Sequence, residues 1–213
     1  MPAKIAAQSD GALDPTVSPL IELWGFGASQ DWAGPPLPFE IEQTLERCGY
    51  TKLNFDAAQR LLRKQVPDLQ LNLSAVAKGY AVDQVAAVLA GQGIEDFLIN
   101  IGGEVRACGA RPDGRAWKVR IAAPQSNGDA SSSAVILREG AIATSGHSQR
   151  FFEYKGQRYA HIIDPRTGRP VENQLRSVSV RAPSCAQADG WATACCVLGR
   201  EAGMALIESL DGV

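Results

Sequence analysis

Short alternating segments fill the chain between residues 97 and 182, and they limit the folds that it can adopt. Apolar and polar residues alternate there in stretches of strand length, separated by turn residues, which predicts β-strands. The stretches are FLINIG, WKVRIAA, SAVILR, AIATSG, RFFEYKGQRYAHII and SVSVRA. Lys155 and Gly156 are the expected hairpin turn inside the fifth. Strands joined by such short connections pair in antiparallel fashion, so a largely antiparallel sheet is expected.

Helical patterns precede and follow this region. The first two predicted helices span residues 39–48 and 74–89, and Ser74 is the expected N-cap of the second. Two more are expected at residues 187–197 and 200–210, separated by Gly199.

Two further local patterns complete the prediction. Val82, Val85 and Leu89 recur at helical spacing and should share one face of the helix over residues 74–89. The leucines at 69, 71 and 73 alternate with polar residues, which predicts a half-buried strand ahead of that helix.

The mixed order of these elements indicates an α+β fold, a mixed and largely antiparallel sheet with packed helices. The chain has 213 residues, is 45% hydrophobic and contains no long linker, so we expect one domain over residues 1–213. The net charge of −2 and the absence of a basic stripe with interleaved aromatic residues argue against a nucleic-acid partner.

Targeting and cysteine signals are sparse. The N-terminus MPAKIAAQSDG has neither an apolar signal segment nor a lipoprotein-type cysteine, and no run is apolar over a membrane-spanning length. The five cysteines include no CxxC pair, so metal-ligand spacing is absent, and an odd number cannot pair completely within one chain. Cys195 and Cys196 lie in an apolar run and are interpreted as small buried residues.

Four clusters could carry chemistry. The first is NLSAVAKGYAVD, where a strand should enter a helix whose first turns contain Ser74, Lys78 and Gly79. A helix N-terminus offers unpaired N–H groups and partial positive charge to a phosphate, and Lys78 would add a full charge. The structural alternative is an ordinary capped helix with a solvated lysine.

The second cluster, NIGGE over residues 100–104, lies at a strand end. Its two glycines would let the backbone approach a ligand closely. The structural alternative is a β-bulge.

The third cluster contains both histidines of the chain, in TSGH and HIIDPRTG. His161 ends a strand just before a turn, where an imidazole could act as a general base. A structural histidine is the alternative, and His147 is interpreted as a loop or structural residue.

The fourth cluster is ADGWAT. Asp189 and Thr193 are four residues apart and share one helix face. A carboxylate and a hydroxyl are oxygen ligands that suit a hard cation such as Mg²⁺. Asp189 as a helix N-cap is the alternative.

Taken together, the segments resemble the FAD:protein FMN transferase family, the ApbE-like proteins once described as thiamine-biosynthesis lipoproteins. The matching strings occur in family order and cover nearly the whole chain. They are GALDPTVSPLIELWGFG, LSAVAKGYAVD, NIGGE, ATSGHSQRFF, HIIDPRTGRPV and ADGWATA.

The resemblance implies an ApbE-like core related to the T-fold, and an enzyme that binds FAD and Mg²⁺. Such an enzyme transfers FMN to a threonine or serine hydroxyl of a partner flavoprotein and releases AMP. The expected partner is a flavin-carrying subunit of a membrane-bound redox complex. A metal-dependent FAD pyrophosphatase that makes FMN and AMP, and a non-catalytic FAD-binding protein, are the alternatives.

The resemblance also implies roles for individual residues. His161 is the expected base. The expected FAD contacts are Ala12, Leu13, Asp14, Asn72, Lys78, Thr144, Ser145 and Ile163. The expected metal ligands are Asp189, Thr193 and the carbonyls of Ala75 and Ala192. Asn72 stands where many family members have an aspartate. The asparagine keeps an acceptor oxygen but lacks the negative charge.

Members of the family extend beyond both ends of this sequence. We therefore expect a chain that lacks the N-terminal segment and the C-terminal end of the family. The resemblance implies a bacterial periplasmic protein or an inner-membrane lipoprotein in the full-length form. No localisation signal is present in the sequence itself, and a cytoplasmic location is the alternative.

Overall fold

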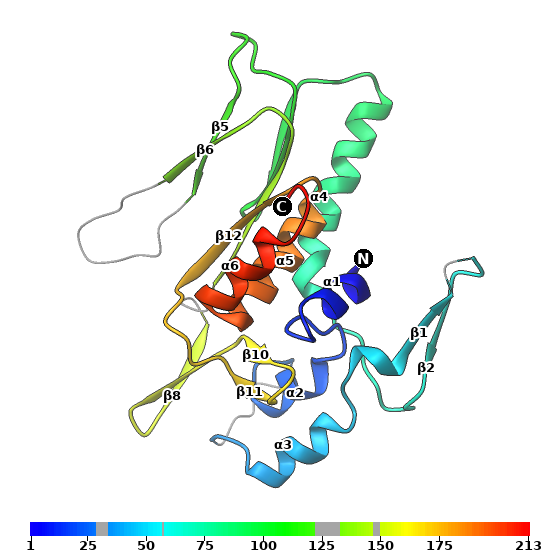
Figure 1. The fold of residues 1–213 in the computed structure, drawn as a ribbon, viewed down its shortest axis with the longest axis vertical. Helices are drawn as coiled ribbons and strands as arrows, with labels where there is room; N and C mark the ends of the chain where they lie inside the picture. Colours follow the sequence, from blue (N-terminus) through cyan, green and yellow to red (C-terminus); the bar gives the residue numbers. More distant parts are fainter. Residues whose placement is uncertain (29–33, 57, 122–132, 147–149) are drawn as a thin grey trace.

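The structure is a computed structural model that describes residues 1–28, 34–56, 58–121, 133–146 and 150–213 (Figure 1). The helices are α1 Pro2–Gln8, α2 Ser18–Leu23, α3 Pro38–Leu45, the 3₁₀ helix η1 Tyr50–Lys52, α4 Ser74–Gly91, α5 Cys185–Leu198 and α6 Arg200–Glu208. The strands of the largest sheet are β3 Phe97–Ile101, β4 Glu104–Cys108, β7 Gly140–Gly146 and β12 Ser177–Ala182.

This four-stranded sheet has the order β12-β7-β4-β3, and every neighbouring pair in it is antiparallel. The turn between β3 and β4 consists of Gly102 and Gly103, both with positive φ. Glycine adopts that backbone region without steric cost, so these residues close a two-residue hairpin. The second cluster of the sequence is therefore a hairpin turn and not a β-bulge.

Helix α5 packs against β7 and β12, while α4 and α6 pack against α5 (Figure 1). The sequence of α5, CAQADGWATACCVL, is almost entirely buried. Its many small residues let the neighbouring elements approach closely. Ser184 is its N-cap, with its Oγ accepting a hydrogen bond from the Gln187 N–H at 3.3 Å. Asp189 therefore lies inside the helix, and the N-cap alternative for it is wrong.

Four two-stranded antiparallel sheets surround this core. They are β1 Leu53–Asp56 with β2 Leu61–Lys64, β5 Trp117–Ile121 with β6 Ser133–Leu137, β8 Phe151–Tyr154 with β9 Gln157–Ala160, and β10 Ile163–Asp164 with β11 Arg169–Pro170. Lys155 and Gly156 close the β8–β9 hairpin, both with positive φ, as predicted. Every strand pairing described is antiparallel, which confirms the α+β class.

A second apolar cluster joins α2 and α3 to β10. Leu20, Trp24 and Ile41 are buried there together with Ile163. Trp24 Nε1 donates a hydrogen bond to the carbonyl oxygen of Gly168 at 2.7 Å, which ties the N-terminal segment to the β10–β11 turn.

The structure corrects the prediction ahead of α4. No strand forms over residues 69–73: Leu69 is buried, but Leu71 and Leu73 are exposed. The predicted N-cap is also shifted, because Ser74 is the first helical residue. Asn72 Oδ1 accepts hydrogen bonds from the Ser74 N–H at 2.9 Å and its Oγ at 2.6 Å, so Asn72 satisfies the helix start.

Other predictions fare unequally. Val82 is buried, whereas Val85, one helical turn later, is exposed. Cys195 and Cys196 are buried and free, as predicted, and burial raises the pKa of the Cys196 thiol to about 12. His147 lies outside the described residues. Within the described part of the chain, no helix is long and apolar enough to cross a membrane.

Candidate functional site

A cavity of about 50 Å³ opens where four segments far apart in the sequence meet. The predicted site residues that line it are Ala12, Leu13, Asp14, Asn72, Ala75, Ile163 and Thr193. The fold thus brings together at one place the loop after α1, the start of α4, the first residue of β10 and the middle of α5.

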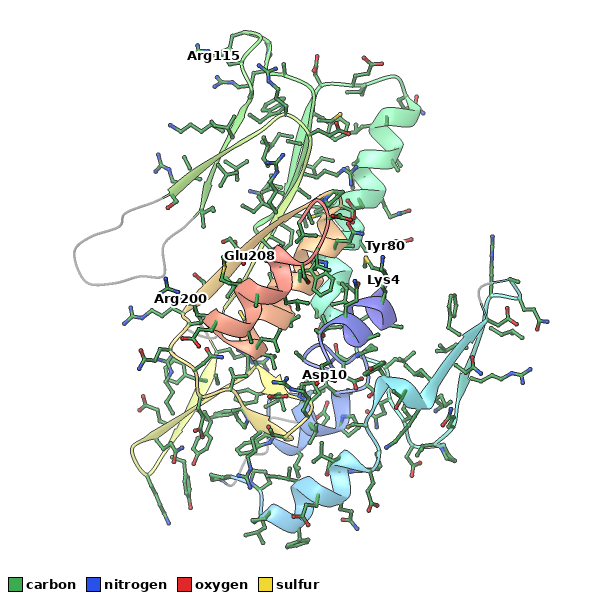
Figure 2. All side chains as sticks on the ribbon, in the orientation of Figure 1. Lys4, Asp10, Tyr80, Arg115, Arg200 and Glu208 are labelled. Atoms are coloured by element: carbon green, nitrogen blue, oxygen red, sulfur yellow. The ribbon has the colours of Figure 1, made fainter. Side chains whose placement is uncertain are left out.

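Hydrogen bonds hold the loop after α1 in place. Asp10, labelled in Figure 2, and Gly11 turn the chain with positive φ at the end of α1. Asp14 Oδ1 accepts from the Thr16 N–H at 2.8 Å and the Thr16 Oγ–H at 2.6 Å, and its Oδ2 accepts from the Tyr50 N–H at 2.8 Å. Both carboxylate oxygens of Asp14 therefore organise the loop itself.

The same loop is joined to the start of α4. The Asn72 N–H donates to the carbonyl oxygen of Pro15 at 2.7 Å. The Asn72 side chain meanwhile accepts hydrogen bonds from Ser74. Asn72 therefore acts as an acceptor, the role that an asparagine keeps when it replaces an aspartate. Ala75, whose carbonyl is an expected metal ligand, lies one residue further along the cavity wall.

Helices α4 and α5 approach closely at Gly79. A Cβ built on Gly79 would lie 2.3 Å from the carbonyl oxygen of Cys185, so only glycine fits there. The close approach lets the Gly79 N–H donate to Asp189 Oδ2 at 3.1 Å. Asp83 of α4 also accepts from the Cys185 and Ala186 N–H groups, both at 2.9 Å, and so caps the start of α5.

Asp189 is only 3% exposed. Burial raises the pKa of its carboxyl to about 6, and the nearby charge of Glu104 acts in the same direction. The Gly79 hydrogen bond and the Lys78 ammonium oppose this shift and favour the ionised form. The result is a buried carboxyl group whose pKa lies above the usual range of an aspartate.

Thr193 follows Asp189 by one helical turn and reaches the cavity wall. Its Oγ1 lies 3.1 Å from Ser145 Oγ on β7. Thr144 points to the other face of β7, because successive side chains of a strand alternate. Its Oγ1 is 2.7 Å from Ser179 Oγ on β12, so Thr144 and Ser145 do not face one common site.

A divalent cation would find oxygen donors here and no other kind. In the described residues, no group of three or more His, Cys, Asp or Glu side chains is placed to hold a metal. One carboxylate, Asp189, with a hydroxyl and main-chain carbonyls is a donor set that a hard cation accepts when substrate phosphates complete it. Ala192, whose carbonyl is an expected metal ligand, is buried on α5 between Asp189 and Thr193 in the sequence.

Six predicted site residues do not line the cavity: Lys78, Thr144, Ser145, His161, Asp189 and Ala192. Lys78 forms an ion pair with Glu104 at the start of β4. His161 Nδ1 lies 3.1 Å from the carbonyl oxygen of Arg150, and its ring packs edge-on against Phe26 with centroids 6.3 Å apart. A carbonyl only accepts, so Nδ1 carries the proton and Nε2 is left with a free lone pair.

Sequence reasoning missed two acidic residues of this region, Asp83 and Glu104. Both belong to strings that carry the family resemblance, yet their partners are distant in sequence. A lone carboxylate in the glycine-rich string NIGGEVRA was the available signal for Glu104.

The fold is that of flavin transferases of known structure. The flavin transferase ApbE from Vibrio cholerae superposes with a TM-score of 0.87 at 39% identity, covering 98% of this chain and 65% of that one. The apo form of the Pseudomonas stutzeri flavinyl transferase ApbE gives 0.84 at 39% identity, covering 97% and 63%.

The sequence comparisons agree. The ApbE family model matches residues 3–213, and this chain belongs to the ApbE family. An FAD:protein FMN transferase of Vibrio cholerae is 43% identical over 203 residues, which are 94% of this chain and 60% of that protein. The Salmonella typhimurium enzyme of the same name is 37% identical over 207 residues, 96% and 59% of the two chains. The chain thus spans about 60% of the length of these curated relatives.

Proposed function

We propose that this chain carries the core of an FAD:protein FMN transferase. In the proposed reaction, a threonine or serine hydroxyl of a partner flavoprotein attacks the FMN phosphorus of FAD. The new phosphoester bond forms as the bond to the AMP phosphate breaks, and AMP leaves. Relatives named for this activity support the proposal, and so does the gathering of five of the eight expected FAD residues around one cavity.

The chain's own residues would position the FAD diphosphate. The first turn of α4 lies beside the cavity, and Thr193 lines it from α5, one helical turn after the buried Asp189. Mg²⁺ held by Asp189, Thr193 and the carbonyls of Ala75 and Ala192 would supply charge neutralisation, which dominates catalysis of phosphoryl transfer. The proposed acceptor is a flavin-carrying subunit of a membrane-bound redox complex.

His161 is the proposed base. Its free Nε2 could accept the proton of the attacking hydroxyl, since Nδ1 is engaged by the Arg150 carbonyl. Burial lowers the pKa of the imidazole, which keeps it unprotonated at neutral pH.

Mass spectrometry of an acceptor protein tests this function. The acceptor would carry a threonine-containing flavinylation motif and be incubated with the chain, FAD and Mg²⁺. We expect a mass gain equal to FMN less one water, the phosphoester adduct, that disappears with EDTA and with Asp189→Ala. FMN and AMP formed without any mass gain on the acceptor would identify an FAD pyrophosphatase instead, and bound FAD with no product would identify a binding protein.

A further inference from the structure

Glu104 is a buried carboxylate with an unused oxygen. The residue is 1% exposed at the start of β4. Its Oε1 pairs with Lys78 Nζ, while Oε2 has no hydrogen-bond partner among the described residues. Leaving a buried carboxylate oxygen unpaired is unfavourable, and a fold that only needed packing would place an apolar side chain there.

The Glu104–Lys78 pair lies next to the Asp189 carboxylate. Lys78 directly precedes Gly79, whose N–H donates to Asp189 Oδ2, and both charges act on the pKa of Asp189. The neighbouring Asp83 and Arg106 pair with each other at 2.6 Å and add no net charge. With Asp189 ionised, two carboxylates and one ammonium leave one uncompensated negative charge.

This charge balance conflicts with a simple role for Lys78 as a phosphate anchor. The Lys78 side chain is half exposed, but its charge is already matched by Glu104. An anionic diphosphate would therefore meet a region that is net negative, whereas a divalent cation would be attracted to it.

We propose that Glu104 is a positioning residue that holds Lys78 and gives the Asp189 region its negative charge. The chain thereby favours a divalent cation at Asp189 and disfavours a nucleotide diphosphate that arrives without one. This inference rests on the proposed function, and it adds a residue and an order of binding to the site.

Two variants test it in opposite directions. Glu104→Gln keeps the side-chain shape and removes the negative charge, and Lys78→Gln removes the positive one. Isothermal titration calorimetry would measure Mg²⁺ alone, and ADP in the presence of EDTA as a probe of the diphosphate. For Glu104→Gln we expect Mg²⁺ to bind roughly three- to tenfold more weakly and ADP to bind more tightly by a similar factor. Lys78→Gln should produce the reverse of both changes.

Asp113→Asn is the matched control. Asp113 pairs with Arg115 at 3.0 Å in an exposed loop, and its replacement removes the same charge away from the site. We expect both dissociation constants to stay within about twofold of wild type, the size of a screened surface effect.

The outcomes separate this inference from the proposed function. If Glu104→Gln weakens both ligands in parallel or changes neither, Glu104 is structural and the inference is wrong. If circular dichroism shows that Glu104→Gln does not fold, Lys78→Gln is the deciding variant. An unchanged or weaker Mg²⁺ affinity of Lys78→Gln would contradict the inference. If the wild-type chain does not bind Mg²⁺ at all, both the inference and the proposed function are wrong. Opposite shifts in a chain that transfers no FMN uphold Glu104 and reject the reaction.

Discussion

His161 differs from the other expected site residues because its neighbours leave one ring nitrogen available. The Arg150 carbonyl takes Nδ1, and Phe26 packs against the ring. We expect His161→Ala to lower the rate of FMN transfer by about 10²- to 10⁴-fold, the usual contribution of a general base. FAD affinity, measured by flavin fluorescence, should stay within about twofold of wild type, because His161 does not line the cavity. Unchanged turnover would remove His161 from the mechanism.

The protonation of His161 can be measured directly. Burial is the main cause that lowers its pKa below 6.5, with the Arg150 charge acting the same way and the Arg150 carbonyl opposing both. The folded chain therefore disfavours the imidazolium, so the His161 contribution to stability is present above pH 6.5 and is lost as the pH falls below it. A proton NMR titration, with the His161 signal assigned by its loss in His161→Gln, should give a pKa below 6.5. A value at or above 6.5 would contradict this placement.

Among the elements, the α4–α5 contact does most to position the site. It carries the Gly79 hydrogen bond to Asp189 and the Asp83 cap of α5. A side chain at position 79 would collide with the backbone of α5 rather than with a movable side chain.

Replacement of Gly79 therefore provides a test of this contact. We expect Gly79→Ala to lower the free energy of unfolding by about 2–4 kcal/mol, as overpacking does at a rigid backbone contact. Gly91→Ala is the matched control on the same helix, since nothing lies within 4 Å of its added Cβ. The control should be neutral or stabilising by up to about 1 kcal/mol, because alanine favours the helix over glycine. Equal urea midpoints for the two variants would mean that α4 and α5 do not approach as described.

The predictions that succeeded at this scale rest on local chemistry. Turn residues such as Lys155 and Gly156 fix a hairpin with information close in sequence. The leucine alternation at residues 69–73 failed because a strand also needs a partner, and none of the described strands pairs with it. Leu69 is buried while Leu71 and Leu73 stay exposed, so the alternation reflects local burial rather than a sheet.

The site was predictable only in part. Segments around Ala12, Asn72, Ile163 and Thr193 were named from the family resemblance, and the fold gathers them around one cavity. No local pattern could place Glu104 opposite Lys78, because the pair joins a strand to a helix 26 residues away. Tertiary packing decides such pairings, and neither hydrophobic periodicity nor secondary-structure propensity predicts them.

The outer surface of α4 sets an expectation for the whole molecule. The helix is apolar on most of its circumference, and Tyr80, Val85 and Val88 are 56%, 41% and 64% exposed. Figure 2 labels Tyr80 on this helix, and Figure 1 shows the second half of α4 extending along the margin of the molecule. Strand β3 beside it pairs only with β4 among the described strands, so an apolar surface adjoins an open sheet edge.

Water-exposed apolar area of this kind favours association between copies of a chain. We expect the sedimentation coefficient of the chain to rise with concentration over the micromolar range, and a variant with both Val85→Lys and Val88→Lys to remain monomeric. The two positions are one helical turn apart, so the paired lysines place like charges on the same surface. Met204→Lys is the control, because Met204 is 55% exposed on α6 and away from that surface. It should associate as wild type does, and association that persists in the double variant would exclude α4 as its cause.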